Sequence, residues 1–186
     1  GAVAAIAFKP ERVEQGLKAS LLLAKSKIFK AVIRLLLPFI SWCAINELIY
    51  HHSSDVLSAL VLAFRRPDTA LWFLLAIFYC IMLTCVFDIL FSVSYLISQK
   101  VGLNAIAVRL SDGRFQIVLM IVFWLLIKEH TPRGAGVSLL RPYFLYFLLG
   151  IGFYCYLYPN MNTWKYLVTC GLFFGAHSIL VENCSW

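Results

Sequence analysis

The sequence predicts an all-α fold, a polytopic integral membrane helix bundle of about five transmembrane helices with a cytoplasmic N-terminus. Hydrophobic residues make up 62% of the 186 residues and charged residues only 13%, whereas soluble domains average about one half and about one quarter. The mean hydropathy is +0.84. The apolar residues are gathered into long runs, which only a bilayer accommodates as solvent.

The chain divides at its first long apolar run. Residues 1–27 carry many lysines around Leu21-Leu22-Leu23, a pattern typical of a basic amphipathic segment at a membrane surface. Residues 28–186 are expected to form the transmembrane bundle, because they contain the apolar runs. The predicted spans are approximately 28–50, 70–97, 115–128, 139–158 and 164–182.

The connections between these runs are polar or short. The run 56–64 is too short to cross a bilayer, so it is expected to be interfacial or re-entrant. Residues 99–114 are expected to form a loop. Pro38 lies inside the first run, where a membrane helix tolerates proline.

The basic residues indicate the orientation. Most of the sixteen Lys and Arg residues lie on the segments that five spans place on the side of the N-terminus, so this side is expected to be cytoplasmic. The net charge of +7 is therefore attributed to topology and not to nucleic acid, which is not expected as a partner. The expected location is the bacterial inner (plasma) membrane.

A basic cluster lies at the start of the first run. Lys27, Lys30 and Arg34 are spaced by three and four residues, so they share one face of a helix. One interpretation is that these charges only set the topology. The other is that they hold the phosphate groups of a donor at the cytoplasmic face.

Other polar residues are candidates for chemistry. Asp88 is the acid deepest within an apolar run, which marks it either as a functional group or as a structural one near the headgroups. His51 and His52 follow the first run, where they form either a solvated loop or a general base with a nearby carboxylate. No metal site is expected, since none of the six cysteines forms a CxxC pair.

Three stretches resemble the membrane acyltransferase-3 family, which includes sugar O-acetyltransferases. Residues 27–42, with Arg34-Leu35-Leu36-Leu37-Pro38, resemble the family's basic cytoplasmic loop and the helix start that follows it. Residues 66–78, with Leu71-Trp72-Phe73-Leu74, resemble a segment entered from the outer face. Residues 143–151 are similar to a later helix that ends in a Leu-Gly pair.

The resemblance implies transfer of an acyl group, commonly acetyl, from coenzyme A to a sugar hydroxyl of a cell-surface glycan or glycolipid. It implies acetyl-CoA as the donor substrate and no permanently bound cofactor. Lys27, Lys30 and Arg34 match the family's donor-side loop, and we expect the acceptor near His51, His52 and Trp72. The catalytic residue stays unknown.

One feature of the family has no counterpart. Its members have an earlier helix with an essential outward-facing histidine, and residues 1–26 contain no histidine. We therefore expect a part of a longer enzyme, a relative without catalysis, or a protein outside the family. The alternative function is a non-catalytic structural or accessory subunit of a larger membrane complex. A transporter would need broken or polar helices along a path, and Asp88 alone does not indicate one.

Overall fold

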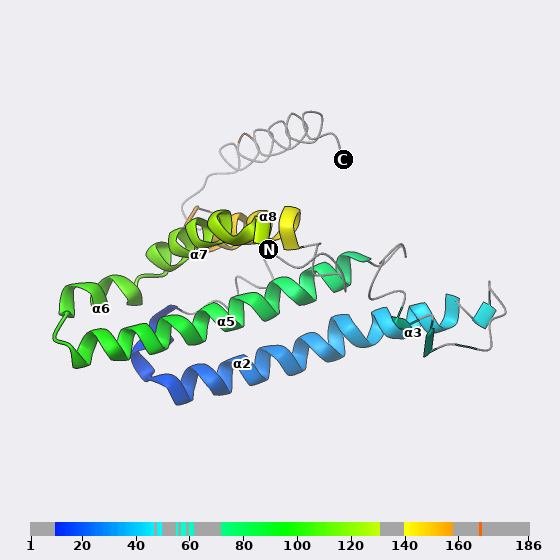
Figure 1. Ribbon diagram of the computed structural model, residues 1–186, viewed down its shortest axis with the longest axis horizontal. Helices are drawn as coiled ribbons and strands as arrows, with labels where there is room; N and C mark the ends of the chain where they lie inside the picture. The colour runs from blue at the N-terminus through cyan, green and yellow to red at the C-terminus, as the bar shows by residue number, and fades with distance from the viewer. Residues whose placement is uncertain are drawn as a thin grey trace.

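The computed structural model describes residues 10–46, 48–49, 55, 57–58, 60–61, 72–130, 140–157 and 168 of the chain. These residues are almost entirely helical and contain no strand. The helices lie in layers, with α2 on one side of the central helix α5 and α7 and α8 on the other (Figure 1). The expectation of an all-α fold is confirmed for this part of the chain.

The first long helix is built from three consecutive elements. A 3-10 helix, η1 (Pro10–Gln15), precedes it, and Gly16 makes the turn between them with a φ of 88°. Then α2 (Leu17–Ala31), η2 (Val32–Leu36) and α3 (Leu37–Asn46) continue without a break. The resulting helix, Leu17–Asn46, has 30 residues and is about 45 Å long. It begins well before Ile28, where the first apolar span is predicted.

The middle element, η2, is a turn of π-helix with a local cause. Pro38 has no backbone N–H, so it cannot donate to the carbonyl of Arg34 as an α-helix requires. The backbone widens by one residue ahead of the proline, and the N–H of Leu37 donates to the carbonyl of Val32. A π-turn inserted into an α-helix changes which residues share a face on either side of it.

The second long helix, α5 (Trp72–Lys100), runs antiparallel to α2 (Figure 1). It ends in a Schellman motif, in which Gly102 has a φ of 80°. The N–H of Leu103 donates to the carbonyl of Ser98, and that of Gly102 to the carbonyl of Gln99. The predicted span over 70–97 falls within this helix almost entirely.

A short helix follows, α6 (Asn104–Ser111), where a loop was expected over 99–114. That expectation is wrong, because Ala107 and Leu110 bury one side of a helical turn against the bundle. The next helix, α7 (Gly113–Ile127), is bent by 88° from α6. Asp112 separates the two, and its side chain accepts a hydrogen bond from the backbone N–H of Arg114.

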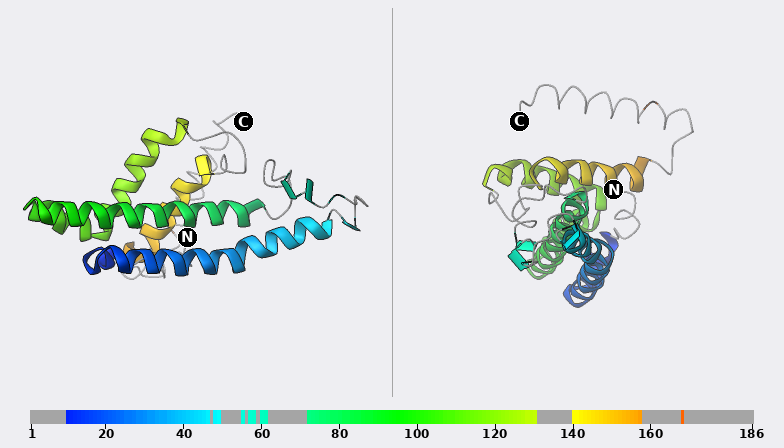
Figure 2. Two further views of the ribbon diagram at one scale, coloured as in Figure 1. Left: turned by 60° about the horizontal axis from the view of Figure 1, so that its bottom comes forward. Right: turned by 90° about the vertical axis from the view of Figure 1, so that its right-hand side faces the viewer.

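The last described helix is α8 (Leu140–Gly152), which continues into a π-turn, η6 (Phe153–Leu157). A 3-10 turn, η4 (Lys128–His130), ends α7. Figure 2 shows α7 and α8 lying across α5 on the side away from α2. The main core forms where α5, α7 and α8 meet, and it includes Phe87, Met120, Trp124, Phe144 and Leu148. A smaller cluster of Phe39, Cys43 and Leu75 joins α3 to α5.

Two of the described helices are long and apolar enough to cross a membrane, Leu17–Asn46 and Trp72–Lys100. The bent pair α6–α7 would add a third if it forms one span. These helices indicate a membrane protein. The predicted span over 164–182, apart from Val168, and most of the run 56–64 lie outside the described residues. The total of about five spans therefore stays a prediction.

Candidate functional site

An ion pair joins the two long helices. Lys27 of α2 and Asp88 of α5 approach to 2.7 Å between Nζ and Oδ2. Both side chains are largely buried, with exposed fractions of 13% and 16%. A carboxylate within an apolar helix is costly unless a cation neutralises it, and Lys27 supplies that cation. Asp88 therefore has a structural partner in the helix pair.

Two serines extend this contact toward the start of α2. The Ser20 and Ser92 hydroxyls hydrogen-bond to each other, and both side chains are buried. The hydroxyl of Ser92 also donates to the backbone carbonyl of Asp88 at 3.0 Å. We call Ser20, Lys27, Asp88 and Ser92 the polar seam. Lys27 contacts Asp88, and Ser20 contacts Ser92, two turns away on α2 and one turn away on α5. Because the two contacts lie at different levels of the antiparallel pair, they hold the helices in one register.

Lys30 and Arg34 are placed differently from Lys27. Both side chains are exposed, and neither forms an ion pair with the described part of the chain. They are four residues apart, around the junction of α2 and the π-turn. Their neighbours on the outer surface are the exposed Phe29, Ile33 and Leu37. The structure thus turns Lys27 toward α5 and directs Lys30 and Arg34 away from the bundle.

These two cations lie within the part of the helix suited to cross a membrane. A crossing stretch of 18 residues with at most two charged side chains must begin after Lys27, so it contains both Lys30 and Arg34. A cation at the centre of a bilayer costs about 2.5 to 3.5 kcal/mol on insertion scales, and the cost is smaller toward the start of the stretch, where Lys30 and Arg34 lie. An anion bound at Lys30 and Arg34 would offset this cost.

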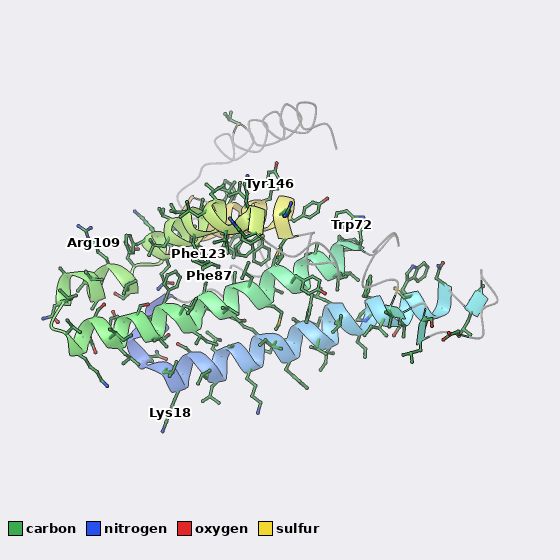
Figure 3. The ribbon with its side chains drawn as sticks, viewed as in Figure 1. Lys18, Trp72, Phe87, Arg109, Phe123 and Tyr146 are labelled. Atoms are coloured by element: carbon green, nitrogen blue, oxygen red, sulfur yellow. The ribbon has the colours of Figure 1, made fainter. Side chains whose placement is uncertain are left out.

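The residues expected on the acceptor side are only partly described. Trp72 begins α5 and is half-buried, and its ring lies 5.0 Å from the ring of Tyr143 in α8 at a tilt of 36°. Figure 3 shows Trp72 at the end of α5 that is far from Lys18 and Arg109. His51 and His52 lie outside the described residues.

Asp55 lies outside the long helices and caps a helical turn. Its carboxylate accepts hydrogen bonds from the Ser58 hydroxyl at 2.6 Å and from the Ser58 N–H at 3.1 Å. These bonds, first the one from the hydroxyl, hold the pKa of Asp55 below its ordinary value.

We expect Ser58→Ala to raise the pKa of Asp55 toward that of an unperturbed aspartate, which carboxyl NMR titration would measure. A folded-state pKa below the unfolded value stabilises the turn above the unfolded pKa, and this stabilisation is lost as the pH falls through the folded pKa. Ser41→Ala, an exposed serine in α3, is the control. An ordinary Asp55 pKa in the parent protein would contradict the prediction.

The described residues hold no candidate metal site. There, no three His, Cys, Asp or Glu side chains lie close enough together to hold a metal ion. What the arrangement offers is a neutralised polar seam inside the helix pair and two cations outside it. The seam serines are not singled out by the sequence, although small polar residues facing each other in two apolar helices are a usual means of helix association.

No family model, no curated protein and no solved structure matches the chain.

Proposed function

We propose that the chain belongs to a membrane O-acyltransferase that moves an acyl group, such as acetyl, from coenzyme A to a sugar hydroxyl of a cell-surface glycan or glycolipid. One observation supports this most directly. Lys30 and Arg34 form an outward-facing cationic pair on an apolar helix, which suits the phosphate groups of the donor. Arg34 would bind a phosphate through two N–H groups, and Lys30 would act as a point charge.

Within this proposal Lys27 does not contact the donor. Its Nζ is already bound to Asp88, at 2.7 Å, and withdrawing it would leave a carboxylate without a partner. Lys27 instead holds α2 in register with α5, which positions the helix that carries Lys30 and Arg34. Asp88 has the same role from the other helix. The N-terminal side of the bundle is cytoplasmic in this scheme, and the membrane is the bacterial inner membrane.

The acceptor would approach at the N-terminal end of α5, which is the outer end in this scheme. Trp72 and Tyr143 lie together there, and aromatic rings are suitable surfaces for the apolar faces of sugars. His51 and His52 belong to the segment between the two long helices. The donor and acceptor would therefore meet from opposite sides of the bilayer.

The test is the affinity of the membrane-extracted protein for acetyl-CoA. Lys30→Gln/Arg34→Gln is expected to raise the Kd at least tenfold, since a hydrogen bond to a charged group contributes about 1.5 to 3 kcal/mol. Lys18→Gln/Lys25→Gln is the control, because it removes two exposed cations from the same helix. Binding of S-acetylpantetheine, which lacks the nucleotide phosphates, should not respond to either pair.

The same cationic pair also supports the second function, a non-catalytic subunit of a larger membrane complex. A carboxylate on a partner helix would neutralise Lys30 and Arg34 as well as a phosphate does. Acetyl-CoA affinity that is unchanged in Lys30→Gln/Arg34→Gln would reject donor binding. Loss of a co-purifying membrane protein from that same variant would then support the subunit.

A further inference from the structure

Three basic residues gather at one end of the helix pair. Lys18 is the second residue of α2, Lys100 ends α5, and Arg109 lies in α6. All three side chains are exposed. Figure 3 shows Lys18 and Arg109 toward the same end of the molecule, with Lys18 directed away from α2 and Arg109 directed away from α6 on the opposite side. The acids described at this end are Glu14 and Asp112, and Asp112 is engaged as the cap of α7.

The same end exposes large apolar side chains. Val101, Leu103, Ile106 and Val108 are 66%, 48%, 47% and 70% exposed, all on α6 or the turn leading into it. Leu22 near the start of α2 is also exposed, at 69%. In water, so many exposed apolar side chains in a short segment would be unfavourable. In the hydrocarbon core of a bilayer, the cations among these side chains would be unfavourable.

Packing holds α6 against the last turns of α5 (Figure 1). Gly102 turns the chain sharply after α5, and the bend of 88° at Asp112 directs α7 away from the line of α6. Ala107 and Leu110 are buried against the bundle. As a result, α6 does not extend either neighbouring helix, and its apolar and basic side chains stay on the outer surface.

We propose that this end, formed by Lys18, Lys100, Arg109 and the exposed apolar residues of α6, binds the headgroups of anionic phospholipids. The cations attract the phosphates of an anionic leaflet. Val101, Ile106 and Val108 enter the boundary between the headgroups and the acyl chains, as the apolar side of an interfacial helix does. The apolar residues select a lipid over a soluble phosphate, which would leave them in water.

The test uses the full chain in mixed micelles that contain equal amounts of phosphatidylglycerol and phosphatidylcholine. Mass spectrometry counts the phospholipids that stay with the protein after gel filtration. We expect the parent protein to retain phosphatidylglycerol at least about fivefold over phosphatidylcholine, because each basic residue near an anionic surface contributes about a factor of five. Lys100→Gln/Arg109→Gln is expected to lower this ratio at least about fivefold, because it removes two of the three basic residues and leaves Lys18.

Lys128→Gln/Arg141→Gln is the charge-matched control, since it removes two positive charges from the end of α7 and the start of α8. It should leave the ratio unchanged. Ile106→Ser/Val108→Ser should reduce the retention of both lipids, because it removes apolar contact and no charge. None of these substitutions changes a buried residue, so the packing of α2 on α5 and of α7 on α8 is kept.

Three results would overturn the proposal. The first is equal retention of the two lipids by the parent protein. The second is an enrichment of phosphatidylglycerol that is as large in Lys100→Gln/Arg109→Gln as in the parent protein. The third is displacement of the lipid by excess inorganic phosphate at constant ionic strength, which would assign these cations to a soluble anion.

Discussion

Replacing Lys27 with Met is expected to lower the free energy of unfolding by about 3 to 5 kcal/mol, because it leaves a buried carboxylate without its cation. The pair is held at 2.7 Å, and both side chains are at least four-fifths covered. Met retains the length and apolar stem of Lys, so the substitution removes mainly the charge. The measurement is the reversible unfolding of the purified protein by SDS in mixed micelles, followed by circular dichroism.

Two further variants separate the ion pair from general effects of charge. Lys30→Met removes the same charge from an exposed position one turn away, and it should change the free energy of unfolding by less than about 1 kcal/mol. Lys27→Met/Asp88→Leu should recover most of the loss, since neither partner is then charged. Equal effects of Lys27→Met and Lys30→Met would show that the pair contributes nothing specific.

Phe144→Ala is expected to lower the free energy of unfolding by about 3 to 5 kcal/mol. The Phe144 ring is fully buried and lies between aromatic neighbours. Its centroid is 6.2 Å from that of Phe87 and 5.0 Å from that of Trp124, with the latter pair edge to face. Removing it leaves a void where α5, α7 and α8 meet, and the surrounding rings lose their dispersion contacts. SDS unfolding of the purified protein measures the change.

Phe123→Ala is the matched control for this prediction. Phe123 also contacts Phe87, edge to face at 5.3 Å, but it is 45% exposed. Its loss opens no enclosed void, so we expect a change of about 1 kcal/mol, the size of one aromatic pair. A loss for Phe144→Ala no larger than that for Phe123→Ala would mean that the three helices do not pack around Phe144 in the membrane.

Hydropathy along the chain predicts the long apolar helices, but it does not always predict where they begin, and it misses a short helix. The run predicted at 115–128 coincides closely with α7 (Gly113–Ile127), whose residues are nearly all apolar. The first helix instead starts at Leu17, ahead of the apolar run. Lysine and leucine are both good helix formers, so the backbone continues where the hydropathy falls. Pattern analysis also misses α6, whose apolar residues are too few for a span.

The candidate site is harder to predict from the sequence, for two physical reasons. The Lys27–Asp88 pair depends on the register between two helices, which the periodicity of either helix alone does not determine. Lys27, Lys30 and Arg34 share a face in a regular α-helix. The π-turn at Val32–Leu36 affects the position of Arg34 alone, because Lys27 and Lys30 both precede it. The packing of α2 on α5 selects Lys27 for the inner side.

The separation of Lys27 and Asp88 along the chain has a consequence for biosynthesis. The two residues are 61 positions apart. At about 5 to 20 residues per second, a ribosome needs roughly 3 to 12 s to make that length. During this interval the first helix carries Lys27 without its carboxylate. We therefore expect the ion pair that holds α2 against α5 to form only after α5 has been made.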